Sequence, residues 1–207
     1  MEEKIIEAYK EMVIKGEEEI NPFTLSQKVG ISEKEFFQYF SSVDDIGRKI
    51  WMRLCDTVML ELNQSELYNS YPARQKILSY FFTFFEVART ERTFISRTLH
   101  KDRIVGAYAK KFKEIALDII QEGIATEDIQ ERFYSSYYPD IVWNLHYSLL
   151  LFWINDDSEN FVETEKAIEI YSKVPLEIMG PNIFDSIFET IKFSIKQINI
   201  PKLLKRL

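Results

Sequence analysis

Side chains that could perform acid–base, nucleophilic or metal-binding chemistry are few in this sequence and are not grouped. The 207 residues contain two histidines, His100 and His146, and one cysteine, Cys55, which is near neither of them in sequence. There is no glycine-rich phosphate loop, Gly-x-Ser-x-Gly or His-Glu-x-x-His pattern. The oxygen-rich run 155–159 lacks the spacing and glycine of a calcium loop and indicates a helix-capping loop instead. We therefore expect a protein that is not an enzyme and that requires no metal and no cofactor.

Aromatic side chains that could recognise a small molecule are concentrated between residues 134 and 153. Together with aromatic residues of other helices, they would line an apolar cavity with a few hydroxyl and imidazole contacts, as small-molecule sites usually do. The alternative is an ordinary filled aromatic core, which the sequence favours for any single residue. A mostly uncharged lining would suit a hydrophobic or flat ligand. The candidate ligand-binding residues are Phe81, Phe85, Tyr108, Phe112, Tyr138, Trp143, His146 and Tyr147.

The stretch 21–46 carries the start and stop signals of two short helices joined by a glycine turn, with a third helix directly after them. Two N-cap patterns, a glycine stop and apolar residues at helical spacing are typical of a helix-turn-helix, although a generic pair of packed helices remains the alternative. The buried edge of the second helix is predicted at Phe36 and Phe40. The signals are an Asn21–Pro22 start, a stop at Gly30, and Ser-x-x-acid starts at Ser32 and Ser42.

From Ile5 to about Trp51 the sequence resembles, without a gap, the N-terminal domain of the TetR/AcrR family of bacterial regulators. The resemblance implies an all-α fold: a three-helix DNA-binding head (1–48), joined by a long fourth helix to a ligand-binding and dimerisation body (49–207). It implies a repressor whose DNA binding is relieved by a small hydrophobic molecule. The matching positions are Lys15-Gly16, Leu25-Ser26, Gly30-Ile31-Ser32, Phe36, Tyr39-Phe40 and Ser42.

Positions carried over from the family place a double-stranded, palindromic DNA operator against the second helix of this motif. Gln38 can read adenine with two hydrogen bonds, and Phe37 or Tyr39 can contact a thymine methyl group. Lysines and helix N-termini hold phosphates. The candidate DNA-binding residues are Asn21, Lys28, Ser32, Lys34, Phe37, Gln38, Tyr39 and Lys49.

The charge of the predicted head opposes DNA binding, because affinity depends on neutralising phosphates. Residues 1–55 hold eight Lys or Arg against eleven Asp or Glu, and Glu33, Glu35 and Val43 depart from the family's usual residues. The alternative function is therefore a TetR-like fold that no longer binds DNA and acts as a lipid or small-molecule binding protein. A local positive rim would favour DNA, provided that the acidic run 17–19 lies away from it. That rim would consist of Lys28, Lys34, Arg48 and Lys49.

Apolar residues at helical spacing predict further helices beyond the motif. A four-residue rhythm starting at Val43, with no breaker before Pro72, predicts one long helix over 43–68 that joins head and body. An apolar stripe predicts a helix over 2–15 that covers the helix-turn-helix. The other predicted helices span about 73–89, 91–100, 104–124, 139–155, 161–179 and 181–199.

The last predicted helix has a broad apolar face. It could pack on the chain's own core, whereas the family resemblance implies an interface in a homodimer about a two-fold axis. The two heads of such a dimer would bind DNA half-sites roughly 34–36 Å apart. The candidate dimer-interface residues are Ile183, Phe184, Ile187, Phe188, Ile191 and Ile195.

Composition predicts a cytoplasmic protein with no membrane partner. The net charge is −7, and the single cysteine excludes an intramolecular disulfide and fits a reducing compartment. The longest apolar stretch, about 149–154, is far too short to span a bilayer, and no segment resembles a signal peptide.

Overall fold

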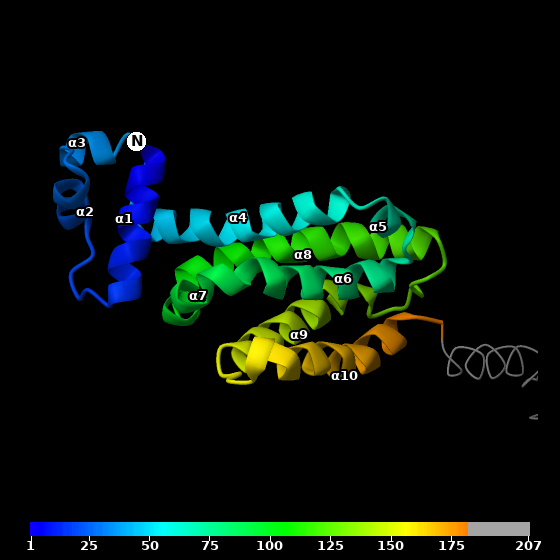
Figure 1. Ribbon diagram of the computed structural model, residues 1–207. Coiled ribbons are helices and arrows are strands. Elements are labelled where there is room, and N and C mark those ends of the chain that lie inside the picture. Colours follow the sequence, from blue (N-terminus) through cyan, green and yellow to red (C-terminus); the bar gives the residue numbers. More distant parts are fainter. Residues whose placement is uncertain (182–207) are drawn as a thin grey trace, which may run out of the picture.

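A computed structural model describes residues 1–181, which form helices joined by turns and contain no strand (Figure 1). The predicted all-α fold is therefore confirmed. The six candidate dimer-interface residues between 183 and 195 lie outside the described residues. The elements are α1 (Glu2–Lys15), α2 (Pro22–Val29), α3 (Glu33–Phe36), α4 (Val43–Asn63), α5 (Glu66–Ser70), α6 (Ala73–Ala88), η1 (Arg89–Glu91), α7 (Arg92–Thr98), α8 (Asp102–Ala125), η2 (Ser135–Tyr137), α9 (Tyr138–Trp153), η3 (Glu159–Phe161) and α10 (Val162–Met179).

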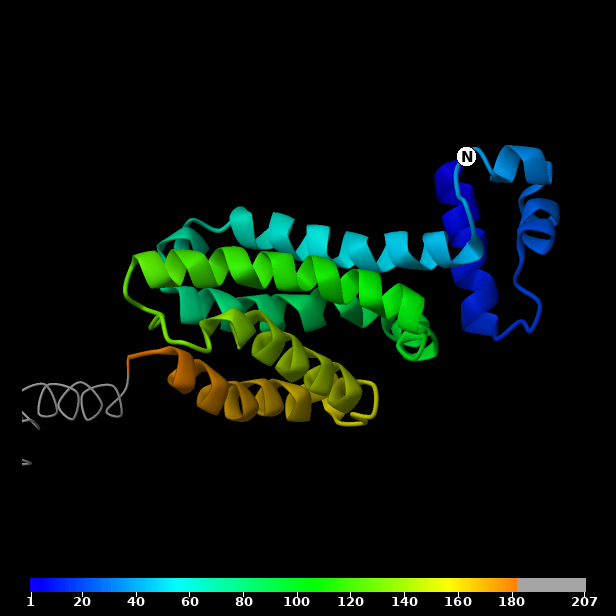
Figure 2. The ribbon, with the colours of Figure 1, turned by 180° about the vertical axis from the view of Figure 1, so that it is seen from behind.

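Helices α1 to α3 form a small head at one end of an elongated body, and α4 runs from the head into the body (Figure 1). Helix α4 packs against α6 and α8, while α9 packs against α8 and α10. Viewed from behind, α9 and α10 form a separate layer on the side of the body opposite α4 (Figure 2). The predicted domain boundary at 48/49 falls inside α4, so one continuous helix belongs to both parts.

Helix α4 ends earlier than the sequence rhythm predicted, and the expected helix over 43–68 was wrong at its C-terminal end. The helix stops at Asn63, and the Ser65 side chain accepts a hydrogen bond from the Tyr68 backbone N–H at 3.4 Å, which begins α5. A serine that caps a new helix competes with continuation of the old one. The four-residue rhythm meets its last apolar residue at Leu62 and reaches Glu66 next, so the pattern itself gave no support for one helix beyond this point.

Head and body share one hydrophobic core, and α1 lies at the point where they meet. Tyr9 is fully buried, and its ring meets the edge of Phe94 from α7 at 6.0 Å between centroids. In the body, the Trp51 indole N–H donates to Thr98 Oγ1 at 2.9 Å. A Cβ on Gly47 would overlap the Ile104 side chain, so this glycine permits the close approach of α4 to α8. The head is thus packed onto the body rather than tethered to it.

The loop between α9 and α10 is the capping loop that the sequence indicated. Asp156 is buried; one carboxylate oxygen accepts from the Ser158 N–H at 2.8 Å, and the other accepts from the Thr164 N–H at 2.9 Å and its hydroxyl at 2.6 Å. Burial alone would raise the pKa of this carboxyl group. The hydrogen bonds from Ser158 and Thr164 outweigh that effect and lower the pKa of Asp156 to about 2.

Replacing this carboxylate tests its role in stability. We expect Asp156→Ala to lower the free energy of unfolding at pH 7 by about 2 kcal/mol, because the start of α10 loses charge-assisted hydrogen bonds. A depressed pKa contributes stability above the ordinary value of 3.8 that is lost as pH falls towards 2. The difference in the free energy of unfolding between wild type and variant, measured with urea, should therefore become smaller below pH 4. Asp157→Ala, at the exposed neighbouring carboxylate, is the control; equal losses for the two variants would contradict this role.

Candidate functional sites

Capping side chains hold the helix-turn-helix in the predicted geometry. Asn21 Oδ1 accepts from the Thr24 N–H at 3.0 Å, and Thr24 Oγ1 accepts from the Asn21 N–H at 3.1 Å. Gly30 ends α2 with a φ of 77°. Ser32 Oγ accepts from the Glu35 N–H at 3.2 Å and starts α3, and Ser42 caps α4 in the same way. The side chains of Asn21 and Ser32 are therefore engaged in holding helix termini, which reduces what they can offer to DNA.

The second helix of the motif presents an exposed ridge. Regular helix covers only four residues of α3, but backbone bonds from Gln38 N to Glu35 O at 3.1 Å and from Tyr39 N to Phe36 O at 3.0 Å continue a helical path. Phe36 and Phe40 are buried as predicted. Phe37 and Tyr39 are 52% and 40% exposed, so their rings are available to a partner. We call the exposed residues Lys34, Phe37, Gln38 and Tyr39 the reading ridge.

Helix α3, at the start of the reading ridge, lies on the side of the head that faces away from the body (Figure 1). In Figure 1, α2 and α3 lie beyond α1, which separates them from the rest of the molecule. A long, rigid partner could therefore approach α3 without meeting the body.

The expected positive rim is largely neutralised by nearby carboxylates. Lys28 Nζ lies 3.2 Å from a Glu11 carboxylate oxygen and 3.5 Å from a Glu17 carboxylate oxygen. The expectation that the acidic run 17–19 lies away from the rim was therefore wrong, because Glu17 contacts Lys28. Lys49 pairs with Glu2 at 2.7 Å. The guanidinium of Arg48 pairs with Asp45. Within residues 1–181, Lys34 is the member of the rim that forms no ion pair.

Ion pairs also fasten α1 to the body. Arg53 of α4 donates to Glu2 at 3.0 Å and to Glu3 at 2.6 Å. On the other side, Lys10 donates to Glu91 of η1 at 2.7 Å. These bonds add to the buried Tyr9 contact, so the orientation of the head is coupled to the positions of α4 and η1.

The aromatic interior of the body is centred on His146. Its ring lies parallel to the rings of Phe112, at 4.6 Å between centroids, and Phe81, at 5.6 Å, while Phe84 meets it edge-on at 4.6 Å. His146 Nε2 is hydrogen-bonded to the Tyr108 hydroxyl, and Nδ1 has no partner among the described residues. Burial lowers the pKa of His146 to about 3, so the imidazole is neutral at physiological pH.

Most of the candidate ligand-binding residues meet in this interior, but they leave no ligand-sized space. Phe81, Phe85, Tyr108, Phe112 and His146 pack against one another, and the hollow beside Phe81 and Phe112 has a volume of only about 10 Å³. The arrangement is the filled core that the sequence left open as the alternative. A ligand site among these residues stays a prediction, and it requires the packing to open.

Three further candidates lie at the edge of this interior or apart from it. Trp143 and Tyr147 are partly buried neighbours on α9, with ring centroids 5.7 Å apart. Tyr138 contacts a different group: its hydroxyl donates to the Gln130 carbonyl at 3.1 Å, and its ring meets Tyr134. Tyr138, the first residue of α9, therefore packs against the connection that precedes this helix and does not join the His146 cluster.

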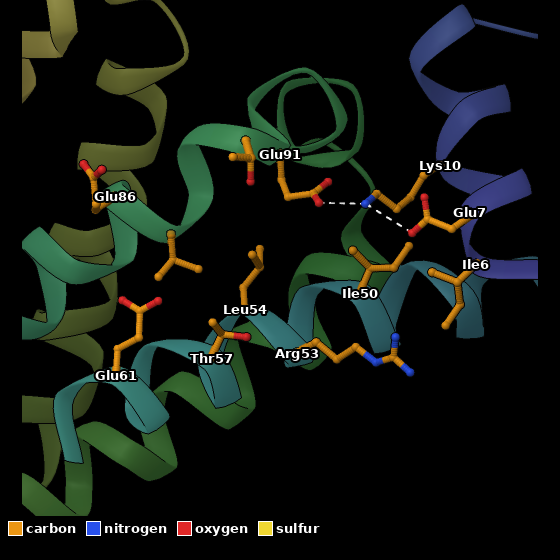
Figure 3. Close-up of a pocket in the computed structure, with 12 residues that line it drawn as sticks. Ile6, Glu7, Lys10, Ile50, Arg53, Leu54, Thr57, Glu61, Glu86 and Glu91 are labelled. Atoms are coloured by element: carbon orange, nitrogen blue, oxygen red, sulfur yellow. Dashed lines mark hydrogen bonds and ion pairs between the residues drawn. The ribbon is translucent and has the colours of Figure 1, made fainter. Parts of the chain in front are cut away.

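An open groove with a volume of about 530 Å³ separates α1 from the body (Figure 3). Sequence reasoning missed it because its walls come from four elements that are distant in the chain. No local pattern marks such a site; only the three-dimensional contact of α1 with α4, α6 and η1 creates it. The lining residues are Ile6, Glu7, Lys10, Ile50, Arg53, Leu54, Thr57, Glu61, Glu86, Val87, Thr90 and Glu91.

The remaining chemistry of the described part is sparse. Residues 1–181 contain no group of three or more His, Cys, Asp or Glu side chains arranged to hold a metal ion. In the same range, no helix combines the length and apolar character required to cross a membrane. Burial raises the pKa of the Cys55 thiol to about 11, so this cysteine is protonated at neutral pH.

Comparison with known proteins assigns the body to a family and supports the fold of the whole chain. Residues 76–193 match the family described as "Tetracyclin repressor-like, C-terminal domain". A crystal structure of a protein from Shewanella sp. PV-4, assigned to the TetR family of transcription regulators, superimposes with a TM-score of 0.63. It covers 87% of this chain and 98% of that one at 10% sequence identity, which is a likeness of fold alone. No curated protein matches the chain.

Truncation of a central ring distinguishes a filled interior from an empty one. We expect Phe112→Ala to lower the free energy of unfolding by about 3–5 kcal/mol, because the ring is buried and stacks on His146. Leu117→Ala, at an exposed position of the same helix, should change it by less than about 1 kcal/mol. Chemical denaturation measures both changes, and a small loss for Phe112→Ala would show that this ring borders empty space.

Proposed function

This chain belongs to the tetracycline repressor-like (TetR) family of transcriptional regulators, and from that premise we propose that it is a repressor that binds operator DNA through its head. The observation that carries the proposal is the exposed reading ridge at the outer end of the molecule. Phe36 and Phe40 anchor the ridge in the core, so its backbone is held in place. A backbone that is already ordered loses little conformational freedom on binding.

Each residue of the ridge offers a distinct contact with a DNA major groove. Gln38 can form two hydrogen bonds with adenine, and the rings of Phe37 and Tyr39 can pack on thymine methyl groups. Lys34, which has no carboxylate partner in residues 1–181, is free to meet a phosphate. Asn21 and Ser32 contribute mainly by holding the helix starts, with their backbones close to the DNA.

Two lysines at the edge of the head would have to exchange partners on binding. Lys28 leaves Glu11 and Glu17, and Lys49 leaves Glu2, if each is to contact a phosphate. Such exposed ion pairs contribute little to stability, so the exchange costs little, but it also yields few net positive charges. We therefore propose that operator binding depends on base contacts at the ridge and has a shallow salt dependence.

The same ion pairs favour a second candidate function. A TetR-like protein that has lost DNA binding and carries a lipid or another small molecule would tolerate carboxylates beside Lys28 and Lys49, and Glu33 in the first turn of α3. The two functions differ in a single property, which is sequence-specific binding to the DNA upstream of the gene.

We propose a homodimer as the DNA-binding form. A palindromic operator requires two heads related by a two-fold axis, and regulators of this family usually form homodimers. The apolar residues between 183 and 195 are the proposed interface. Its location rests on the sequence pattern and not on the described structure.

Relief of repression by a small hydrophobic molecule completes the proposal. Helix α4 and the ion pairs of α1 couple the head to the body, so a ligand that favours one arrangement of the body changes the spacing of the two heads. The aromatic interior around His146 is one proposed site, provided that it opens. No part of this mechanism requires catalysis, and its target places the protein in the cytoplasm.

Substitutions in the reading ridge test operator binding. We expect wild type to bind its own upstream DNA at low salt, and Gln38→Ala to weaken specific binding by about 1–3 kcal/mol because adenine loses its partner. Lys34→Ala should weaken binding to all DNA sequences and reduce the slope of log binding constant against log salt concentration by about one. Lys110→Ala, at an exposed lysine of α8 in the body, is the control. Failure of wild type to bind at any salt concentration would exclude the repressor and favour the carrier.

A charge in the proposed interface tests the dimer. We expect Phe188→Asp to produce monomers in sedimentation velocity experiments, because an aspartate buried between two copies would lack a partner. Asp185→Asn, at a neighbouring position that is not predicted to face the partner, should leave the dimer intact. A Phe188→Asp protein that remains dimeric would exclude this interface.

A further inference from the structure

The groove between α1 and the body is a built space of the size that small-molecule sites occupy. Its volume of about 530 Å³ falls within the roughly 300–1,000 Å³ of ligand pockets, whereas the hollow in the aromatic interior has about 10 Å³. A ligand would enter the groove without displacing any core side chain. One wall belongs to the head, through residues of α1, and the others belong to α4, α6 and η1 of the body (Figure 3).

The groove is elongated and has an apolar floor. Its lining on α4 extends from Ile50 to Glu61, a separation of eleven residues along the helix, or about 16.5 Å at 1.5 Å per residue. Between these ends, Leu54 of α4 and Val87 of α6 provide hydrocarbon, and Ile6 of α1 closes one end. An extended alkyl chain fits this shape better than a compact polar molecule does.

The charges of the lining specify a cation. Four glutamates face two basic residues, and both basic residues already have partners: Lys10 is paired with Glu91, and Arg53 is paired with Glu3. Glu61 forms no ion pair or hydrogen bond within residues 1–181. Glu86 has only a 3.6 Å contact with Arg89. The lining therefore carries an excess of negative charge, which Arg89 offsets only in part at Glu86 and which no described group offsets at Glu61.

This excess lies at one end of the groove. Figure 3 shows Glu61 on α4 and Glu86 on α6 at the end of the groove away from α1, and the Lys10–Glu91 ion pair at the opposite end. An occupant that matches the charge and the apolar floor has a positive group beside Glu61 and Glu86 and a hydrocarbon chain that extends along the floor towards Ile6.

We propose that this groove binds an elongated amphipathic amine, with its ammonium group between Glu61 and Glu86 and its alkyl chain on Ile50, Leu54 and Val87. The inference deepens the proposed regulation by naming the place and chemical class of an effector, while the binding itself does not require DNA. Because the walls come from both head and body, the affinity for the amine depends on the orientation of the head. Occupancy and operator affinity are then linked, each changing the other by the same factor.

Titration calorimetry of the full chain without DNA tests the site. The probes are decylammonium and decanoate, both below the concentration at which they form micelles; they share a chain length and differ in the sign of the charge. We expect decylammonium to bind wild type at least tenfold more tightly than decanoate. The double variant Glu61→Gln, Glu86→Gln keeps the shape of the groove, removes its charge, and should weaken decylammonium binding at least tenfold. Glu114→Gln, at an exposed glutamate of α8, should bind as wild type does.

A blocking variant distinguishes the groove from other apolar sites. Thr57 is exposed and lines the groove, so Thr57→Trp should fill the space and abolish decylammonium binding while the thermal unfolding temperature stays unchanged. Binding of decylammonium to Thr57→Trp with wild-type affinity, equal binding of the two probes, or no binding of decylammonium to wild type would each overturn the proposal. Failure of the protein to bind DNA would leave these results unaffected, so the two proposals fail separately.

Discussion

The burial of α1 between the helix-turn-helix and the body is the constraint on which the rest of the structure depends. The Tyr9 ring packs against Phe94 of α7. Gly47 of α4 lies beside both Ile104 of α8 and the Tyr9 hydroxyl, where a side chain would not fit. Since α1 also covers the inner side of α2 and α3, a single helix fixes the orientation of the reading ridge and builds one wall of the groove. A motion of α1 would alter both.

The charges around this helix bear directly on the proposed DNA binding. The head carries more acidic than basic residues, and several of its carboxylates form ion pairs with its basic residues. Glu2 pairs with Lys49 and Arg53, and Glu11 pairs with Lys28. These pairs hold α1 against its neighbours and reduce the field that would attract phosphates. Together with the net charge of −7, this arrangement disfavours non-specific attraction to DNA.

Most features that depend on neighbouring residues were predictable from the sequence, although the cap at Ser65 was missed, whereas features that depend on distant residues were not predictable. The caps at Asn21, Ser32 and Ser42 and the turn at Gly30 act over three or four residues, so their sequence pattern indicated their structure correctly. The pairing of Lys28 with Glu17, and the groove, depend on how α1 packs, which no local pattern encodes. Most of the candidate aromatic residues of the body come together around His146, whereas Tyr138 does not, and periodicity does not distinguish a filled core from a cavity.

Amide hydrogen exchange of the full chain, with and without its own upstream DNA at low salt, measures most directly whether the ridge meets DNA. If the ridge enters a groove of the duplex, residues 22–40 will become protected, while α9 will keep its exchange rates. Unchanged exchange throughout the head, or protection confined to the body, would contradict the assignment of this surface to DNA.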